Sequence, residues 1–303
     1  MNFVALLLGL GIERLLTHLF HLREFRWLDP FFDWVTERLR DQSRGRALAG
    51  VVLGIAIAVA PVAIISDALS GTLFQVPYFV LAVLILLFSL GPRDLKTEVD
   101  EYCAAVRAGN AEEADRVARE LWEGDLPDNL DEQTTLIRRA VFIQANNRIF
   151  GTVFWFLILG PTGAWMFRVL DLMRRRLAFR YNRSEQDFCN TALVWAVRAT
   201  HGVLAWLPAR LLMVGYGLAG SFDGAFSAWR GYSRTDGYEF FRVTNDVLDI
   251  VGNGATGATA VDSMAAADAF AAKVASAMDL VVRTLWLIWC PAIALMTLTD
   301  WLS

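Results

Sequence analysis

The chain has few of the residues that build covalent or metal-held frameworks. Its 303 residues include three cysteines and three histidines. Cys103, Cys189 and Cys290 lie far apart, and no CxxC or zinc-like spacing occurs, so we expect reduced thiols. His18 and His21 are one helical turn apart without a third ligand nearby, and we expect no metal there. No Ser-His-Asp or Cys-His set can be assembled either.

The chain also has no large excess of positive or negative charge. The formal net charge is −4, and no basic domain or base-stacking motif occurs, so a nucleic-acid partner is not expected. Lys96 and Lys273 are the only lysines among 28 basic residues. Arginine suits bidentate recognition of carboxylates and phosphates, although a GC-rich genome would give the same bias.

Apolar residues are abundant instead. They make up 55% of the chain, and the mean hydropathy is +0.40, which is high for a soluble domain. Ala47–Ile65 and Leu73–Leu90 are each uncharged over at least eighteen residues, long enough to span a bilayer. The loop Ser66–Thr72 has no Lys or Arg, whereas both flanks are rich in arginine. The positive-inside rule therefore places this loop outside and the flanks in the cytoplasm.

A third uncharged run, Ile149–Phe167, is interrupted in its middle by Gly160-Pro161-Thr162-Gly163. As a continuous helix it would be about 28 Å long, close to the bilayer core of about 30 Å. Both of its flanks are basic, however, which favours a segment that enters, turns at the Gly-Pro break and returns to the same side. Irregular backbone at membrane depth is tolerated only where protein covers it or a wet cavity adjoins it. The run therefore predicts an intramembrane pocket with polar walls.

Other segments carry weaker signals. Residues 199–222 contain Pro208 and Arg210, so we expect a second broken or surface-lying membrane segment. Gly252–Thr259 imitates a phosphate-binding loop but lacks its lysine and the preceding strand, and we interpret it as a flexible linker. Leu280–Thr299 predicts a last span, and the N-terminal stretch begins without the features of a cleavable signal peptide.

Helix-capping signals are clear in the polar segment between the membrane runs. Asn110 followed by Glu113 predicts a capped helix over 111–123. Gly109 is placed to end the helix before it. Asp131 is placed to cap a third helix.

These patterns predict an all-α integral membrane helical bundle with a re-entrant or broken helix and a cytoplasmic helical portion. In chain order, the expected parts are an N-terminal apolar helix with a basic cytoplasmic loop (1–46), a transmembrane hairpin (47–91), a cytoplasmic helical insert (92–148), broken or re-entrant membrane segments (149–222), a cytoplasmic Gly/Ala-rich region (223–278) and a C-terminal transmembrane helix (279–303).

The candidate ligand-binding residues are polar or ionisable groups on or beside apolar segments, where such groups usually face a bundle interior or a cavity. They are Glu13, Arg14, Asn146, Asn147, Arg148, Asp171 and Arg210. The run from Asn146 to Arg148 has the donors to hold an anion at a cavity mouth. Asp171 and Arg210 are candidates for a pair inside a shared pocket.

Structural alternatives stay open for each of these candidates. Glu13 and Arg14 can lie at headgroup level. The run from Asn146 to Arg148 can be an interfacial anchor. An Asp171–Arg210 pair can be purely structural, since losing one partner of a buried pair costs about 3–5 kcal/mol.

Short motifs along nearly the whole chain support a family resemblance. They are Ile12-Glu13-Arg14, Arg26-Trp27-Leu28-Asp29, Leu73-Phe74-Gln75-Val76-Pro77, Phe154-Trp155, and Trp206-Leu207-Pro208-Ala209-Arg210-Leu211 followed by Tyr216 and Gly220. By their order and spacing the chain resembles the AmpE family. The resemblance implies an inner-membrane modulator of β-lactamase induction, usually encoded with a cytoplasmic amidase of cell-wall recycling.

AmpE proteins are in turn similar to the CobD/CbiB enzymes, which join an aminopropanol group to a corrinoid carboxylate. Where those enzymes have E-N-x-x-D-G, this chain has Asn146 to Gly151 without either acid. Of their N-T-L-D-x-M run it keeps Asp171 and Met173. Their D-D-x-x-N run reads His201 to Ala205, again without acids that would bind Mg²⁺ or activate an amine. The similarity therefore implies an inherited cavity with changed chemistry.

The leading hypothesis is a non-catalytic sensor or modulator in peptidoglycan recycling and β-lactamase induction, which binds a small anionic ligand such as a muropeptide without a cofactor or metal. We expect a multi-pass protein of the bacterial inner membrane with long cytoplasmic loops. Its expected partners are the lipid bilayer, the recycling amidase and a second copy of the chain.

Two alternatives remain. One is an ATP- and Mg²⁺-dependent amide-forming enzyme that uses the remaining acids Glu13, Asp171, Asp187 and Asp223. The other is a transporter, because broken membrane helices are frequent in transporters.

Overall fold

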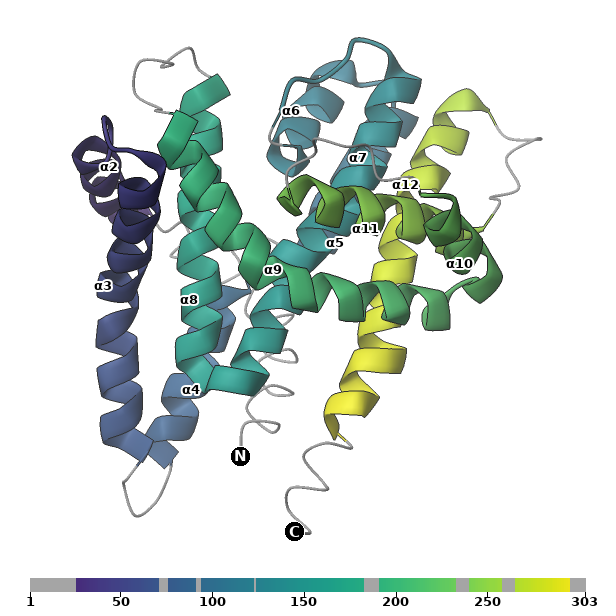
Figure 1. Ribbon diagram of the computed structural model, residues 1–303. Helices are drawn as coiled ribbons and strands as arrows, with labels where there is room; N and C mark the ends of the chain where they lie inside the picture. Colours follow the sequence, from purple (N-terminus) through teal and green to yellow (C-terminus); the bar gives the residue numbers. More distant parts are fainter. Residues whose placement is uncertain are drawn as a thin grey trace. The chain divides into compact units, whose positions relative to one another are not determined.

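The computed structural model describes residues 26–70, 76–90, 94–122, 124–182, 191–232, 240–257 and 265–294 (Figure 1). The described residues are almost all helical, and none of them forms a strand. The predicted all-α class is therefore confirmed. The main helices are α2 (Asp29–Arg38), α3 (Arg44–Ser70), α4 (Val76–Ser89), α5 (Leu95–Arg107), α6 (Ala111–Leu121), α7 (Leu130–Ala145), α8 (Gly151–Asn182), α9 (Thr191–Ala219), α10 (Phe222–Gly231), α11 (Phe240–Thr256) and α12 (Ala266–Thr284).

Among the described residues, four helical stretches are long and apolar enough to cross a membrane: Arg44–Ser70, Leu130–Ala178, Ala192–Ala219 and Ala266–Ala294. The helix α4 is also apolar but shorter. Large apolar side chains such as Leu53, Ile57 and Ile64 on α3 are exposed. Such a surface is unfavourable in water and favourable in lipid. The chain is a membrane protein.

The chain folds as two compact units. Unit 1 comprises Met1–Pro92 and Asn147–Ala205, and unit 2 comprises Arg93–Asn146 and Trp206–Ser303. The core of unit 1 joins α2, α3, α8 and the start of α9. Its buried members include Phe32, Val51, Val169 and Leu193, one from each helix.

The predicted break in the third apolar run is confirmed. Gly160 interrupts α8 with φ 64° and ψ −150°, a conformation open almost only to glycine. Pro161 follows and removes a backbone donor, which prevents a helical bond across the turn. Figure 1 shows the two arms of α8 meeting at the lower end of the helix, from which the second arm returns beside α3. A broken helix therefore positions the polar residues of unit 1.

In unit 2, two of the three predicted helix signals are confirmed. The Asn110 side chain accepts a bond from the Glu113 N–H, and Gly109 has a positive φ of 68°. The third signal is wrong, because Asn129 caps α7 by accepting from the Asp131 N–H at 2.9 Å. The asparagine lies before the first helical turn, where its side chain reaches the exposed N–H groups. Asp131 is already inside that turn.

The predicted break within 199–222 is wrong, since α9 runs without interruption from Thr191 to Ala219. Pro208 lies inside it and leaves the carbonyl of Leu204, four residues earlier, without its helical donor. The Trp155 indole N–H donates to that carbonyl at 3.0 Å. This donor, supplied from α8, allows the helix to continue through the proline.

The predicted linker at Gly252–Thr259 is also wrong in its first part, because α11 extends to Thr256. A Cβ at Gly252 would overlap the Phe142 ring, and one at Gly254 would overlap the backbone of Gly224 on α10. The glycines therefore permit close helix packing here. Gly257, with a φ of 70°, ends the helix.

The last apolar helix begins earlier than expected. Helix α12 starts at Ala266 and continues through a π-helical turn, Leu285–Trp289. The expected boundary between a cytoplasmic region ending at 278 and a membrane helix starting at 279 therefore falls inside one helix. Residues 295–299 of the expected span lie outside the described residues.

Candidate functional site

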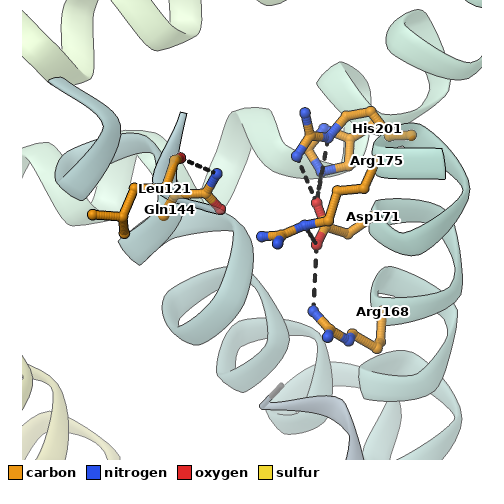
Figure 2. Close-up of polar contacts among 7 residues, drawn as sticks. Leu121, Gln144, Arg168, Asp171, Arg175 and His201 are labelled. Atoms are coloured by element: carbon orange, nitrogen blue, oxygen red, sulfur yellow. Dashed lines mark hydrogen bonds and ion pairs between the residues drawn. The ribbon is translucent and has the colours of Figure 1, made fainter. Parts of the chain in front are cut away.

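A buried carboxylate on the second arm of α8 is surrounded by basic groups. Asp171 Oδ1 accepts from Arg174 Nη2 at 2.8 Å, and Oδ2 accepts from Arg175 Nε at 2.9 Å. Arg168 Nη1 is 3.4 Å from Oδ2, and His201 Nε2 is 3.8 Å from Oδ1. Figure 2 shows the side chains of Arg168, Arg175 and His201 directed at the carboxylate. We call these five residues the Asp171 cluster.

The local sequence explains this arrangement. The three arginines stand three residues before, three after and four after Asp171, and residues at these spacings are neighbours on one helix surface. His201 comes from α9, where its ring stacks on Phe167 at a centroid distance of 5.5 Å. The cluster therefore joins one arm of the broken helix to the start of α9 within unit 1.

Burial makes the electrostatics of the cluster strong. Arg168 is 1% exposed, Asp171 0% and His201 6%. Charges removed from water in this way are stable only when they are paired and hydrogen-bonded. A carboxylate offers about four acceptor positions, whereas each guanidinium carries about five donors. The cluster therefore gathers guanidinium groups, the donor type that binds anionic oxygen groups most strongly, around one buried carboxylate.

The predicted residues Asn146 to Arg148 lie in a π-helical turn, Asn146–Phe150, between α7 and α8. Such turns often occur at functional sites. Asn147 and Arg148 are buried in unit 1, and Asn146, 1% exposed, belongs to unit 2. Within the described part of the chain, neither polar atom of the Asn146 side chain has a hydrogen-bond partner. A buried amide without partners costs about 1–3 kcal/mol, which a bound ligand or water would recover.

The turn is anchored on its α7 side. Gln144 donates from its side-chain amide to the carbonyl of Leu121 at 3.1 Å, which joins α7 to the end of α6 within unit 2 (Figure 2). Asn146 therefore follows a fixed segment of α7.

Asp171 and Arg210, predicted as a possible pair, have different immediate surroundings. Asp171 has its four basic partners in unit 1. Arg210 belongs to unit 2, where Nη1 contacts Met213 Sδ at 3.4 Å and the guanidinium lies 5.7 Å from the centre of the Trp206 ring. The pair is not needed to neutralise Asp171, and it stays a prediction.

The remaining predicted groups are less informative. Glu13, Arg14 and Asp187 lie outside the described residues, as do His18 and His21. Asp223 is exposed on α10. Among the described residues, no group of three or more His, Cys, Asp or Glu side chains could hold a metal ion.

The sequence prediction missed Arg168, Arg174, Arg175 and His201. It treated the arginines as a basic membrane flank, and His201 as a departure from a related motif. The spacing of the arginines around Asp171 was the available signal, because it places them on one surface of a helix.

Together, these features define an all-α membrane protein in which a broken apolar helix carries a buried, arginine-rich polar site. The chain matches the family described as "Regulatory signalling modulator protein AmpE" over residues 1–291. It belongs to the AmpE family, as the sequence motifs predicted.

The similar proteins include an AmpE protein and CobD proteins. The chain is 26% identical to Protein AmpE of Shigella flexneri over 232 residues, which cover 76% of this chain and 78% of that protein. It is 27% identical over 130 residues to Cobalamin biosynthesis protein CobD of Stutzerimonas stutzeri (strain A1501), covering 38% of this chain and 41% of that protein. Cobalamin biosynthesis protein CobD of Chromobacterium violaceum is 26% identical over 150 residues, which cover 44% of this chain and 46% of that protein. The chain thus spans less than half the length of either CobD relative. No solved structure matches the chain.

Proposed function

We propose that this AmpE-family protein is a sensor or modulator of the bacterial inner membrane that acts in β-lactamase induction and peptidoglycan recycling by binding a small anionic ligand. The family description supports a role in regulatory signalling. The ligand-binding part of the proposal depends on the Asp171 cluster. Its partners in this proposal are the bilayer, a cytoplasmic cell-wall-recycling amidase and a second copy of the chain, and it needs no cofactor.

The observation that carries the proposal is the burial of ionisable side chains within a candidate membrane helix. Arg168 and Asp171 are almost completely buried in the stretch Leu130–Ala178. Ionisable groups at such positions are costly, and they usually mark a binding site or a pathway. Arg148 and Asn147 are buried in the π-helical turn that leads into the first arm of the same broken helix. A structural ion pair needs only two buried charged side chains, and this stretch buries more polar and charged side chains than that.

The chemistry of the cluster favours a ligand with carboxylate groups. Guanidinium groups bind carboxylates through two parallel hydrogen bonds. Muropeptides present several carboxylates on a small peptide, which makes them suitable candidates.

Ligand-dependent thermal stabilisation of the purified protein tests the proposal. A ligand at one hundred times its dissociation constant stabilises a protein by about 2.7 kcal/mol, so muropeptides should raise the unfolding temperature of the native chain. Arg175→Gln should abolish the increase. Arg176→Gln is the matched control, because Arg176 bonds to Asp33 of α2 at 3.0 Å and not to Asp171.

Two results would contradict this account. One is the absence of any increase with muropeptides of different lengths. The other is an equal response in Arg175→Gln and Arg176→Gln. In cells, the same pair of variants should differ in β-lactamase induction, with only Arg175→Gln departing from the native response.

A second candidate function is favoured by the partial similarity to CobD proteins. It is an ATP-dependent amide-forming reaction, with Asp171 as the acid that remains from the related motif. Nucleotide turnover by the purified protein, lost in Asp171→Asn, would support it. Binding of muropeptides without turnover would favour the sensor.

A further inference from the structure

One face of helix α10, Phe222–Gly231, packs against the rest of unit 2. Ser221 caps the helix by accepting from the Gly224 N–H at 3.2 Å. Gly224 lies directly against the backbone of Gly254 on α11, and Ala225 is buried. These contacts fix how α10 is rotated in unit 2.

A second face of α10 is aromatic and exposed. Phe222 is 60% exposed, Phe226 43% and Trp229 50%. Residues at these spacings lie on one side of a helix. The Phe222 and Phe226 rings stack at 6.1 Å, and Phe226 lies 6.0 Å from Trp229. The result is a continuous row of three aromatic rings on the outside of unit 2.

The third face is polar and lies beside the aromatic one. Asp223, Ser227 and Arg230 are exposed, and at 100° per residue they occupy the adjoining arc of the helix. The Arg230 guanidinium lies 5.6 Å from the centre of the Phe226 ring, a cation–π distance. Exposed aromatic and charged faces therefore adjoin along the length of α10.

The aromatic row follows an apolar helix end in the chain. Leu211, Val214 and Leu218 on the end of α9 are exposed, and they belong to the candidate membrane stretch Ala192–Ala219. Helix α10 begins three residues later and follows α9 directly in Figure 1. The aromatic row thus starts where an apolar membrane helix ends.

We propose that α10 lies in the interface of the lipid bilayer, with Phe222, Phe226 and Trp229 inserted at the boundary of headgroups and acyl chains. Aromatic side chains favour this depth, and short amphipathic helices lie there with their apolar face buried. Arg230 is placed to contact anionic lipid headgroups, while Asp223 and Ser227 face water. A part of the region expected to be cytoplasmic is therefore anchored to the membrane.

Site-specific quenching in reconstituted full-length protein tests this inference. The native cysteines are replaced by alanine, and a single cysteine is introduced at Phe226→Cys or, as the matched control, at Ser227→Cys. Each carries an environment-sensitive nitrobenzoxadiazole probe, and the protein is placed in nanodiscs of phosphatidylethanolamine and phosphatidylglycerol. Lipids with a nitroxide near the headgroup should quench most of the fluorescence at position 226 and little at 227. Aqueous iodide should show the opposite preference.

Two different quenching patterns would contradict the placement of α10 in the bilayer interface. Strong iodide quenching at both positions, with no lipid quenching, would place α10 in water. Protection of position 226 from both quenchers would show that protein covers the aromatic row, and it would also overturn the inference. Thermal unfolding of each labelled protein, compared with the cysteine-free parent, shows whether the fold survives labelling. The measurement does not depend on muropeptide binding, so its failure leaves the proposed function unaffected.

Discussion

Asp171 is the residue on which the polar site of unit 1 depends. It is fully buried, and it is the carboxylate that Arg168, Arg174 and Arg175 share. Three guanidiniums so close together would repel one another in a medium of low dielectric constant. The carboxylate therefore allows the three guanidiniums to lie close together in the interior of unit 1.

Removing this charge should destabilise the protein strongly. Asp171→Asn leaves neighbouring buried cations without their shared carboxylate, and we expect a loss of about 3–5 kcal/mol in the free energy of unfolding. Thermal unfolding in detergent measures the loss. The double variant Asp171→Asn/Arg175→Gln should recover part of it, because one cation is then gone. A stability of Asp171→Asn equal to that of the native chain would contradict this role.

Unit 2 should lose stability in alkali through a buried thiol. Burial raises the pKa of Cys103 from 9.0 to about 11, and the thiol donates to the carbonyl of Ala271 at 3.4 Å. Between these two values the unfolded chain releases the thiol proton while the folded chain keeps it, so stability falls as pH rises, by roughly 2–3 kcal/mol in total. Cys103→Ala should show a smaller decline of unfolding temperature between pH 9 and pH 11. Equal slopes in the two proteins would exclude this explanation.

At the scale of elements, a proline inside an apolar helix is accommodated by a tryptophan of the broken helix. Trp155 donates to the carbonyl of Leu204, one turn before Pro208. Trp165 donates to the carbonyl of Ala58 at 3.1 Å, in the turn before Pro61. The Trp155 bond replaces the donor that Pro208 has removed, whereas the carbonyl that Pro61 leaves without its helical donor is that of Ile57, next to Ala58.

A double-mutant cycle can measure one of these bonds. Trp155→Phe keeps the ring but loses the N–H, which should cost about 1–3 kcal/mol because the Leu204 carbonyl is left without a donor. In a Pro208→Ala background the helix supplies its own N–H, so the same change should cost less. Thermal unfolding of the four proteins gives the coupling energy. A coupling energy of zero would show that the indole does not compensate for the proline.

The break in α8 depends on one glycine. Gly160→Ala places a side chain where φ is 64° and close to the Tyr78 hydroxyl, and such strain costs about 1–3 kcal/mol. Gly45→Ala is the control, because a Cβ there meets nothing within 4 Å and the position is helical. We expect unfolding at lower temperature for Gly160→Ala, and at the same or a slightly higher temperature for Gly45→Ala. Comparable behaviour of the two variants would mean that the turn tolerates a side chain.

At the scale of the whole molecule, features with a local cause could be predicted from the sequence. A Gly-Pro pair inside an uncharged run indicates a helix break whatever surrounds it. Asn110 before Glu113 is likewise a complete signal for a helix start. The membrane class followed from the length and apolar character of the runs.

Features that depend on distant partners could not be predicted. The continuity of α9 requires Trp155, which lies 49 residues before Leu204. Arg175 and Arg176 are neighbours in the chain, yet one bonds to Asp171 and the other to Asp33, 143 residues away. The glycines of α11 suggested a flexible linker. The local sequence does not show that they pack against Phe142 and Gly224, which lie elsewhere in the chain. Only the fold shows which basic residues form the site.

The central claim is that the broken helix enters the membrane and returns to the same side, carrying the Asp171 cluster with it. Helix α2 is bonded to the second arm through Asp33 and Arg180, so the side of the membrane on which α2 lies is the side on which that arm ends. Helix α7 leads into the first arm, so its side is the side on which the first arm starts. Single cysteines at the exposed positions Glu37 and Glu132, with Asp67 at the far end of α3 as a reference, can be labelled in spheroplasts with a membrane-impermeant maleimide. The account predicts that Glu37→Cys and Glu132→Cys are labelled only after permeabilisation, and Asp67→Cys before it. Labelling of Glu37→Cys and Glu132→Cys from opposite sides would show that the chain crosses the membrane at the break and would contradict the account.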